Sequence, residues 1–262
     1  MTARRAIVRV AQGAEPAHTP DDLAVESPLV LAHDDAPIAT LMRTPGHDIE
    51  LAAGWLVVES GVRAADDIVT LRACRDDDTD RVHITLRDGV RPPRPRAFVT
   101  SAACGVCSAD VLDLRPLATS RPHSRGWQLS AGTIAALPDA LRGQQRTFAR
   151  TGAVHAAGLA DEDGTLRVVR EDVGRHNAVD KIVGRALLDG ELPAQDRLLV
   201  VSGRVSFEIV QKAVAAGAAG IVAVSAPSSL AVDLAREYDL LLAGLVRNGR
   251  LNVYAGERLV RF

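Results

Sequence analysis

Residues 198–224 read LLVVSGRVSFEIVQKAVAAGAAGIVAV, and this stretch decides the fold class. It opens on an apolar run at 198–201 and closes on a second one at 221–224. Between them, apolar residues recur at helical spacing over about 206–216, and Gly217 is placed to end that helix. A strand, a helix and a strand in this order are typical of two parallel strands joined across one face of a sheet.

The sequence predicts the same alternation of strands and helices on both sides of this stretch. Downstream, a helix with Ser228 near its first turn leads to an apolar strand at 240–246, and a turn leads to a last strand at 251–254. Upstream, a short strand at 168–169 precedes helical spacing over 179–187. Continuous apolar strands separated by helices predict an α/β domain with a parallel sheet covered by helices on both faces.

The N-terminal half follows a different pattern, with short strands around one helix. The expected strands are 6–10, 23–31, 38–42, 68–72 and 82–86. Asp48 is a candidate N-cap for the helix, and Gly61 can end it. We therefore expect a smaller α+β domain over residues 1–115, a linker at 115–127, and the larger α/β domain over 127–262.

Composition narrows the function classes. The chain has 262 residues, a net charge of −2 and 47% hydrophobic residues, so it is expected to be soluble and globular, without extended nucleic-acid binding. No apolar run reaches the roughly 18 residues needed to span a membrane. Three cysteines do not form a disulfide framework, so a cytoplasmic location is expected.

Two of the cysteines form the motif Cys104-Gly-Val-Cys107. Such a pair can hold a metal, cycle a disulfide or carry sulfur as a persulfide, and all three use a thiolate. A zinc deaminase needs His-x-Glu followed by Pro-Cys-x-x-Cys. Here His155 is followed by Ala157 in place of the glutamate, and the cysteines lie upstream. Catalytic zinc is therefore disfavoured, whereas disulfide exchange stays open.

Three polar segments are candidate ligand sites. Ser202-Gly203-Arg204 and residues 225–228 each follow an apolar strand, where backbone N–H groups at helix starts suit phosphate. Ordinary capping turns are the alternative interpretation. Residues 170–181, REDVGRHNAVDK, are unusually polar for the start of a core helix. This density predicts a ligand surface or a buried polar network, or a solvated helix start with Asp172 as its cap.

Taken in order, these segments resemble the FdhD family of sulfur carriers over nearly the whole chain. The resemblance rests on residues 25–29 (VESPL), 44–46 (TPG), 50–54 (ELAAG), 104–107 (CGVC), 151–156 (TGAVHA), 170–181, 202–206 (SGRVS), 225–231 (SAPSSLA), 246–247 and 252–254. The CxxC alone is a weak signal, whereas the twelve-residue run in this order is specific.

The resemblance implies a function and a fold. FdhD-like proteins take sulfur from an IscS-like cysteine desulfurase as a cysteine persulfide. They pass it to the molybdenum cofactor, in its bis-molybdopterin guanine dinucleotide form, before insertion into formate dehydrogenase. The same resemblance implies a homodimer and a cytidine-deaminase-like three-layer α-β-α domain without catalytic zinc. Cys104 and Cys107 take the sulfur-carrying role.

The resemblance places the guanine dinucleotide cofactor at residues 245–250, and the strand-end argument adds further contacts. The expected cofactor-binding residues are Leu245, Val246, Arg247, Asn248, Gly249, Arg250, Ser202, Gly203, Arg204, Arg175 and His176. The arginines among them would balance the charge of the cofactor phosphates. Three other functions remain: a CxxC oxidoreductase, a cofactor chaperone without sulfur chemistry, and a structural zinc clip.

Overall fold

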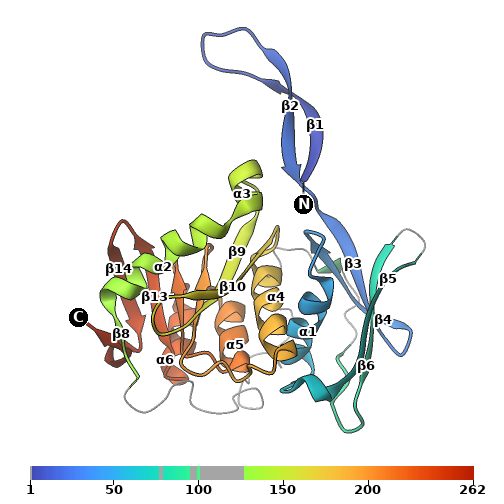
Figure 1. Cartoon of the computed structure of the whole chain (residues 1–262), viewed down its shortest axis with the longest axis vertical. Coiled ribbons are helices and arrows are strands. Elements are labelled where there is room, and N and C mark those ends of the chain that lie inside the picture. The colour runs from blue at the N-terminus through green and yellow to red at the C-terminus, as the bar shows by residue number, and fades with distance from the viewer. Residues whose placement is uncertain (1, 77–78, 95–98, 101–126) are drawn as a thin grey trace.

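The computed structural model describes residues 2–76, 79–94, 99–100 and 127–262 (Figure 1). Its largest sheet has six strands in the order β10-β9-β11-β12-β13-β14. Their bounds are β9 His155–Ala160, β10 Leu166–Asp172, β11 Leu198–Val201, β12 Gly220–Ala223, β13 Leu241–Arg247 and β14 Arg250–Ala255. The strands predicted at 198–201, 221–224, 240–246 and 251–254 are present within one residue of the expected bounds, and the short strand predicted at 168–169 lies inside the longer β10.

The parallel arrangement predicted for the strands joined by helices is confirmed for β11, β12 and β13, but it does not extend to the rest of the sheet. β9 and β10 form a hairpin that pairs antiparallel to β11, and β14 folds back on β13. The β13–β14 turn uses Asn248 and Gly249, both at positive φ, as a tight hairpin requires. The sequence did not predict β9, since its residues HAAGLA are mostly small and carry little strand signal.

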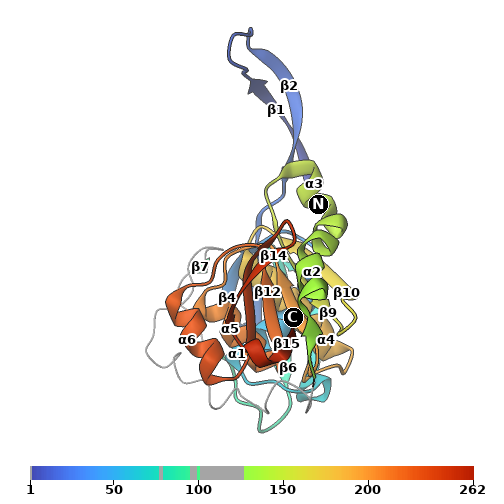
Figure 2. The ribbon, with the colours of Figure 1, turned by 90° about the vertical axis from the view of Figure 1, so that its left-hand side faces the viewer.

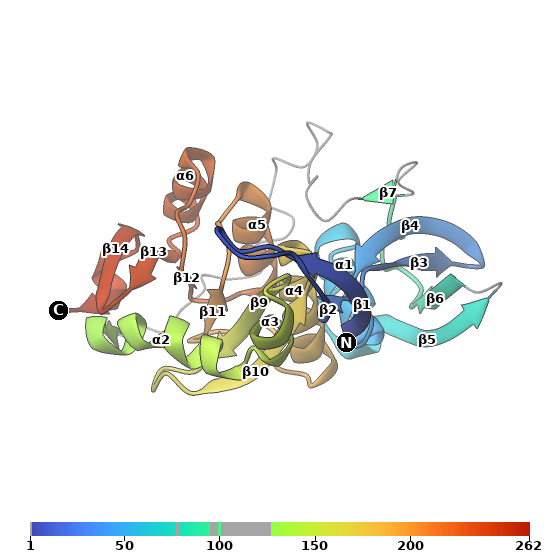
Figure 3. The same cartoon turned by 90° about the horizontal axis from the view of Figure 1, so that it is seen from above.

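Helices cover both faces of this sheet, so the three-layer α/β class is confirmed (Figures 2 and 3). α2 (Ala131–Gln144), which the sequence did not predict, packs on one face. α4 (Arg175–Leu188), α5 (Phe207–Ala216) and α6 (Ser229–Glu237) pack on the other. β11 is buried on both sides: Leu198 and Val200 belong to the core under α2, and Leu199 and Val201 to the opposite core.

The N-terminal half contains a five-stranded sheet in the order β5-β6-β3-β4-β7. Its strands are β3 Ser27–His33, β4 Ala36–Arg43, β5 Ile68–Asp76, β6 Thr79–Leu86 and β7 Val99–Thr100. A separate hairpin, β1 (Thr2–Arg9) and β2 (Ala17–Ala24), projects from the body (Figure 1). The predicted strand at 23–31 is therefore two strands, with a break at residues 25 and 26.

α1 (Asp48–Glu59) joins the two halves. It lies between the N-terminal sheet and α4 (Figure 3), and its apolar residues share one core cluster with α4 and α5. The two helices are in backbone contact at two glycines. A Cβ added to Gly54 would lie 1.9 Å from the Asp180 carbonyl oxygen, and one added to Gly184 would lie 1.8 Å from the Glu50 carbonyl oxygen. The predicted linker lies outside the described residues except for Trp127, so the domain boundary stays a prediction.

The remaining elements are short. They are α3 (Arg146–Thr151), the strand pair β8 (Leu129–Ser130) and β15 (Val260–Arg261), and 3-10 turns at Ala65–Asp67 and Glu257–Leu259. The predicted N-cap of α1 is wrong by one residue: His47 holds this position in the left-handed conformation, and Asp48 is the first helical residue. Among the helices that the structure describes, none has the length and apolar character to cross a membrane.

Candidate anion-binding site at the carboxyl edge of the sheet

The polar segments meet at one edge of the six-stranded sheet. β11, β12 and β13 end there, since they are parallel. β9 runs the other way, so His155 begins β9 at the same edge and pairs with Asp172, the last residue of β10. The Ser202 amide donates to the Ala156 carbonyl at 3.0 Å, and the Ser202 hydroxyl accepts from the Ala156 amide at 2.9 Å. These bonds fix the end of β11 against the start of β9.

Three helices also begin at this edge, at Gly174 (α4), Ser206 (α5) and Ser228 (α6). The Ser228 hydroxyl accepts a hydrogen bond from the Ala231 amide and so caps α6. Each N-terminus places unpaired backbone N–H groups and a partial positive charge at the edge. Their convergence at the ends of parallel strands is the usual geometry of a phosphate site.

The charged side chains at the edge add to the partial positive charge of the helix N-termini. A Cβ added to Gly203 would lie 3.3 Å from His155 Nδ1 and 3.7 Å from Arg175 Cβ, so these three residues are in contact. Burial lowers the pKa of His155, and the charges of Arg175, His176 and Arg204 lower it further. Within the described residues, the buried Nε of Arg175 has no hydrogen-bond partner. An anion at this edge would meet uncompensated positive charge.

His176 is tied to α5. Its Nε2 lies 2.7 Å from Glu208 Oε2 and 3.4 Å from Ser206 Oγ. The hydrogen bond with His176 lowers the pKa of Glu208. The serine and the carboxylate contact the same ring nitrogen, whereas a Ser-His-acid relay uses both nitrogens. The trio therefore orients the start of α5 and is not arranged to activate Ser206 as a nucleophile.

A cavity of about 510 Å³ opens beside this edge, a size typical of small-molecule sites. Its floor comes from the sheet edge and its wall from α2, α3 and the segment after them. The lining residues are Pro138, Asp139, Arg142, Gln145, Phe148, Gly152, Ala153, Val154, His155, Ser202, Val224, Val246, Arg247 and Asn248. A second hollow, bordered by Leu245, Arg247, Asn248, Arg250 and Asn252, lies on the other side of the β13–β14 turn.

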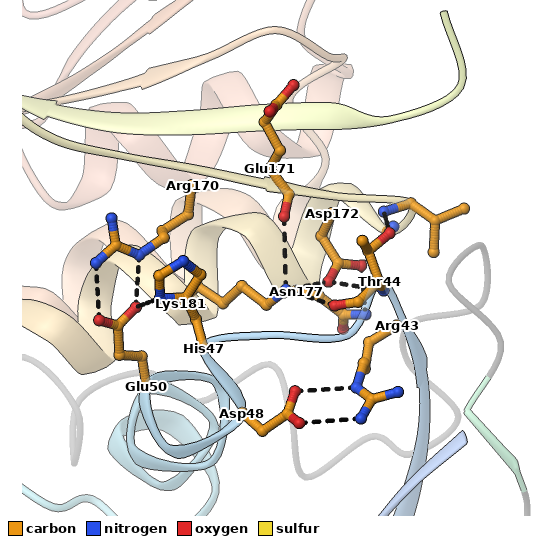
Figure 4. Close-up of polar contacts among 12 residues, drawn as sticks. Arg43, Thr44, His47, Asp48, Glu50, Arg170, Glu171, Asp172, Asn177 and Lys181 are labelled. Atoms are coloured by element: carbon orange, nitrogen blue, oxygen red, sulfur yellow. Dashed lines mark hydrogen bonds and ion pairs between the residues drawn. The ribbon is translucent and has the colours of Figure 1, made fainter. Parts of the chain in front are cut away.

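Asp172 lies at the centre of a buried polar network between the two halves (Figure 4). This side chain is 0% exposed. Its carboxylate accepts hydrogen bonds from the amides of Thr44 and Gly174 and from the Asn177 side chain, and it pairs with Lys181 Nζ at 2.7 Å. The interpretation of this run as a solvated helix start is wrong, because every lone pair of Asp172 is engaged inside the protein.

The same network ties the N-terminal half to β10 and α4. Lys181 also donates to the Thr44 carbonyl at 2.9 Å, and Asn177 donates to the Met42 carbonyl at 2.8 Å. Beside it, Arg170 forms a two-point ion pair with Glu50, at 2.6 and 2.7 Å (Figure 4). The run 170–181 therefore has two roles. Four of its polar residues hold the halves together, namely Arg170, Asp172, Asn177 and Lys181, whereas Arg175 and His176 reach the sheet edge.

Comparison with known proteins identifies the family. A family model described as the FdhD/NarQ family matches residues 24–261. The chain belongs to the FdhD/NarQ family. It is 46% identical to a protein from Nocardia farcinica named sulfur carrier protein FdhD, over 100% of this chain and 95% of that one. Relatives of the same name from Streptomyces avermitilis (99% of this chain, 96% of that one) and Mycobacterium tuberculosis (90% of each) are 45% and 41% identical.

A solved structure from Desulfotalea psychrophila has the same fold as this FdhD/NarQ chain. It is described as that of a proposed formate dehydrogenase accessory protein. The two chains align with a TM-score of 0.78 over 99% of each, at 23% sequence identity. The two chains therefore share the arrangement of sheets and helices described above, without close sequence identity.

Most of the cofactor contacts predicted for this FdhD/NarQ chain come together at the edge. Arg175, His176, Ser202, Gly203 and Arg204 lie around the starts of α4 and α5. Residues 245–250 span the end of β13, the turn and the first residue of β14, with Leu245 in the left-handed conformation. The 510 Å³ cavity joins the two groups, because both Ser202 and Arg247 line it. Cys104 and Cys107 lie outside the described residues.

Sequence reasoning missed the outer wall of the cavity. Asp139, Arg142, Gln145 and Phe148 belong to α2, α3 and their junction, which carry no motif and were not predicted as helices. His155 was weighed only as a zinc ligand, yet it lies on the cavity floor. Its glycine-flanked segment, 152–158, was the one sequence signal that this backbone lies close to another element.

Proposed function

We propose that this chain is a sulfur carrier for formate dehydrogenase that acts on the molybdenum cofactor in its guanine dinucleotide form. The observation that carries the proposal is the sheet edge where three helix N-termini, Arg175 and Arg204 gather, with a 510 Å³ cavity beside it that His155 and Ser202 line. Family membership supplies the sulfur-carrying part, since the curated relatives are named sulfur carrier proteins.

The loading step is a thiolate exchange at Cys104. The Cys104 thiolate attacks the outer sulfur of the persulfide on an IscS-like cysteine desulfurase. A new S–S bond forms at Cys104, the S–S bond of the donor breaks, and the donor leaves as a thiolate. Cys104 then carries a persulfide, and no external oxidant or reductant is consumed.

The delivery step uses Cys107. Its thiolate attacks the inner sulfur of the persulfide, forms a Cys104–Cys107 disulfide and expels hydrosulfide with the bonding electron pair. The hydrosulfide binds the molybdenum of the acceptor. The disulfide is reset by two electrons from cellular thiols, which a reducing cytoplasm supplies.

The acceptor suits the sheet edge chemically. The guanine dinucleotide arms carry pyrophosphate groups, and helix N-termini with arginines are the standard protein partners of phosphate. Arg175, Arg204, Arg247 and Arg250 supply the positive charge, with Ser202, Gly203 and His176 beside them. In this arrangement Leu245, Val246, Asn248 and Gly249 shape the turn between the two hollows.

β7 is the last strand that the structure describes before the cysteines. β7 runs parallel to β4, with Thr40 opposite Val99 and Leu41 opposite Thr100. β4 continues to Thr44, whose amide donates to Asp172 beside the start of α4. β7 therefore points, at Thr100, toward the end of β4 that lies next to Thr44. In sequence, Cys104 follows four residues later. A homodimer with formate dehydrogenase as its client completes the proposal.

Intact-protein mass spectrometry tests the sulfur role. The protein is incubated with a cysteine desulfurase and cysteine, as wild type, Cys104→Ala and Cys107→Ala. We expect mass gains in whole sulfur units that reductant removes. Cys104→Ala should abolish the gain, whereas Cys107→Ala should keep it and lose delivery. A folded, reduced wild type that gains no sulfur would contradict the proposal and favour a cofactor chaperone.

Complementation separates the carrier from a cofactor chaperone, and the sulfur gain measured by mass separates it from a disulfide oxidoreductase. In a cell that lacks its own copy, the carrier role requires that Cys104→Ala fail to restore formate dehydrogenase activity, whereas a chaperone without sulfur chemistry would still restore it. A disulfide oxidoreductase would lose all activity with Cys107→Ala and would show no sulfur gain. Stoichiometric zinc bound to both thiols of the purified protein would instead favour the structural clip.

A further inference from the structure

The β1–β2 hairpin stands apart from the body of the molecule (Figures 1 and 2). In the described part of the chain, neither hydrophobic core includes a residue of the hairpin. Near the body, Asp22 forms an exposed ion pair with Arg150 of α3, at 3.0 Å. A two-stranded hairpin that stands alone is marginally stable at best in water. The single chain offers this hairpin little support, so its stability calls for a partner surface.

The hairpin also exposes apolar side chains. Val8, Val10 and Leu23 are 53%, 69% and 43% exposed. They are three of the seven large apolar side chains that are exposed in the described part of the chain, although the hairpin is a small share of its length. Apolar side chains gathered on a projecting element are typical of a protein–protein contact, because burying their area stabilises association.

Only one edge of the hairpin suits the addition of another strand. Within the described residues β1 and β2 pair only with each other, so each has one edge without a neighbouring strand. β2 carries Pro20, which has no N–H to offer to a further strand. β1 contains no proline, so its outer edge keeps a full row of backbone donors and acceptors. An added strand therefore pairs along β1.

We infer that β1 pairs antiparallel with β1 of a second copy of this chain, with Ala6 opposite Ala6, and that the two hairpins form a four-stranded sheet. The inference rests on the proposed function, because it assigns the contact surface of the homodimer named there. The two copies are related by a two-fold axis that passes between the β1 strands. Pro20 disfavours pairing at the outer edges, so the assembly closes at two copies.

The arginines of β1 restrict the register of this pairing. The two-fold axis places one residue opposite its own copy, and like charges directly opposite each other destabilise a strand pair. An axis at Arg4 or Arg5 would place arginine opposite arginine. An axis at Ile7 would place Arg5 opposite Arg9 of the second copy. These three registers are therefore disfavoured.

An axis at Ala6 avoids every pair of opposed arginines. Arg4 then faces Val8 of the second copy, and Arg5 faces Ile7. The arginine stems cover these apolar side chains while the charged ends stay in water. An axis at either neighbour of this central group, residue 3 or residue 8, pairs only three residues of each β1 strand, whereas the axis at Ala6 pairs residues 3–9. The Ala6 register therefore combines a long ladder with the absence of like-charge contacts.

The acidic residues of β2 reduce the repulsion that the arginines of two β1 strands would create. Asp22 lies opposite Arg4, and Asp21 lies opposite Arg5 in the hairpin. Asp21 also lies 3.9 Å from Arg9. Opposite charges on neighbouring strands stabilise their pairing. β1 can therefore approach a second β1 with its positive charge compensated from within its own hairpin.

Disulfide cross-linking tests the contact on the full-length protein with Cys74, Cys104 and Cys107 replaced by serine. Ala6→Cys places two thiols at directly opposed positions, where Cα atoms are about 4.5 to 5.5 Å apart and within disulfide reach. After mild oxidation, most of this variant should migrate as a covalent dimer on a non-reducing gel, and as a monomer after reduction. The matched control is Ala17→Cys, also exposed but on β2, which should migrate as a monomer in both gels.

Sedimentation equilibrium measures the strength of the contact. Ala6→Lys places two ammonium groups opposite each other and should weaken the dimer by roughly fivefold. Ala17→Lys adds the same charge to β2, away from the two-fold axis, and should leave the dimer within about twofold of wild type. Equal weakening in both variants would show a general effect of charge and would overturn the inference.

The outcomes separate this contact from the proposed function. Arg5→Cys should not cross-link, because its two copies are diagonal and about 7 to 8 Å apart, so a covalent dimer there in place of Ala6→Cys would overturn the register. A dimeric wild type with a monomeric Ala6→Cys would overturn the contact. A monomeric wild type would overturn the homodimer as well and leave β1 to a strand of another protein. Sulfur loading at Cys104 is measured independently by mass.

Discussion

The junction between α1 and α4 and the carboxyl edge of the main sheet are both rich in charged side chains. The charges are buried and paired at the junction, whereas they are exposed at the edge. At the junction, Asp172, Lys181, Glu50 and Arg170 are buried or nearly so, and each has a partner. At the edge, Arg204, Arg247 and Arg250 are exposed. In the part of the chain that the structure describes, they form no ion pair.

This difference separates structural charge from functional charge. A buried charge without a partner costs several kcal/mol, so the charges of the junction must be matched for the chain to fold. The edge keeps like charges together on helix N-termini, which is unfavourable for the protein alone and favourable once an anion binds. Substitutions at the junction should therefore affect folding, and substitutions at the edge should affect binding.

The largest effect is expected where the junction is tightest. Gly184→Ala places a methyl group 1.8 Å from the Glu50 carbonyl oxygen, so α1 and α4 must separate. We expect a loss of more than about 4 kcal/mol in the free energy of unfolding, measured by urea denaturation. The control is Gly143→Ala near the end of α2, where an added Cβ meets nothing within 4 Å. That variant should be neutral or slightly stabilising, and equal losses in both variants would refute the tight contact.

Breaking the buried ion pair should have the next largest effect. Lys181→Met leaves the fully buried Asp172 carboxylate without its cation and should cost about 3 to 5 kcal/mol of unfolding free energy. Arg150→Met removes an exposed pair with Asp22 and should cost at most about 1 kcal/mol. The same urea midpoint for the two variants would contradict the prediction that the buried ion pair contributes more to stability than the exposed one.

Acid should weaken the junction through Glu50. Burial raises the pKa of Glu50, but hydrogen bonds from Arg170 and His47 outweigh it and lower the pKa from 4.5 to about 2. The ionised form is favoured by folding, so this stability is present above pH 4.5 and is lost as the pH falls toward 2. The loss should be about 3 kcal/mol. Urea denaturation at several pH values measures the free energy of unfolding of wild type and of Glu50→Gln. Between pH 4.5 and 2 the variant should lose less stability than wild type. Equal losses in the two proteins would contradict the assignment to Glu50.

Neutralising the edge should have the smallest effect on folding. Arg204→Ala should change the unfolding free energy by less than about 0.5 kcal/mol, because the side chain is exposed. It should weaken GDP binding by roughly tenfold, since a charge-assisted contact is lost. It should also raise the pKa of His155, which Arg204 helps to lower. NMR titration of the imidazole measures that shift, and Arg72→Ala on β5 serves as the control.

The sequence predicted those parts of the fold where local pattern and tertiary packing agree. The strands at 198–201 and 221–224 are apolar throughout because both faces of the sheet are covered, and the structure places them there. It did not predict β9, whose small residues serve close packing at Gly158, where an added Cβ would meet Leu166 at 3.0 Å. The antiparallel direction of β9 depends on long-range pairing, which a local pattern does not encode.

The sequence likewise predicted part of the candidate site. Ser202, Gly203 and Arg204 were located correctly at a strand end, because the carboxyl ends of parallel strands share an edge. The two roles of residues 170–181 were not separable in sequence, since Asp172 and Arg175 are both charged and only three positions apart. Their difference arises from the neighbours: Thr44 meets Asp172 from 128 residues away, whereas Arg175 faces the open edge.

The packing of α1 against α4 also sets the order in which the chain can fold during synthesis. Glu50 and Arg170 are 120 residues apart, a distance that a ribosome covers in about 6 to 24 s. During that interval the apolar face of α1, which includes Leu51 and Leu56, has no α4 to cover it. The N-terminal half is therefore an early product that stays incomplete until the run 170–188 emerges. Nascent chains stalled before α4 should need a chaperone to remain unaggregated.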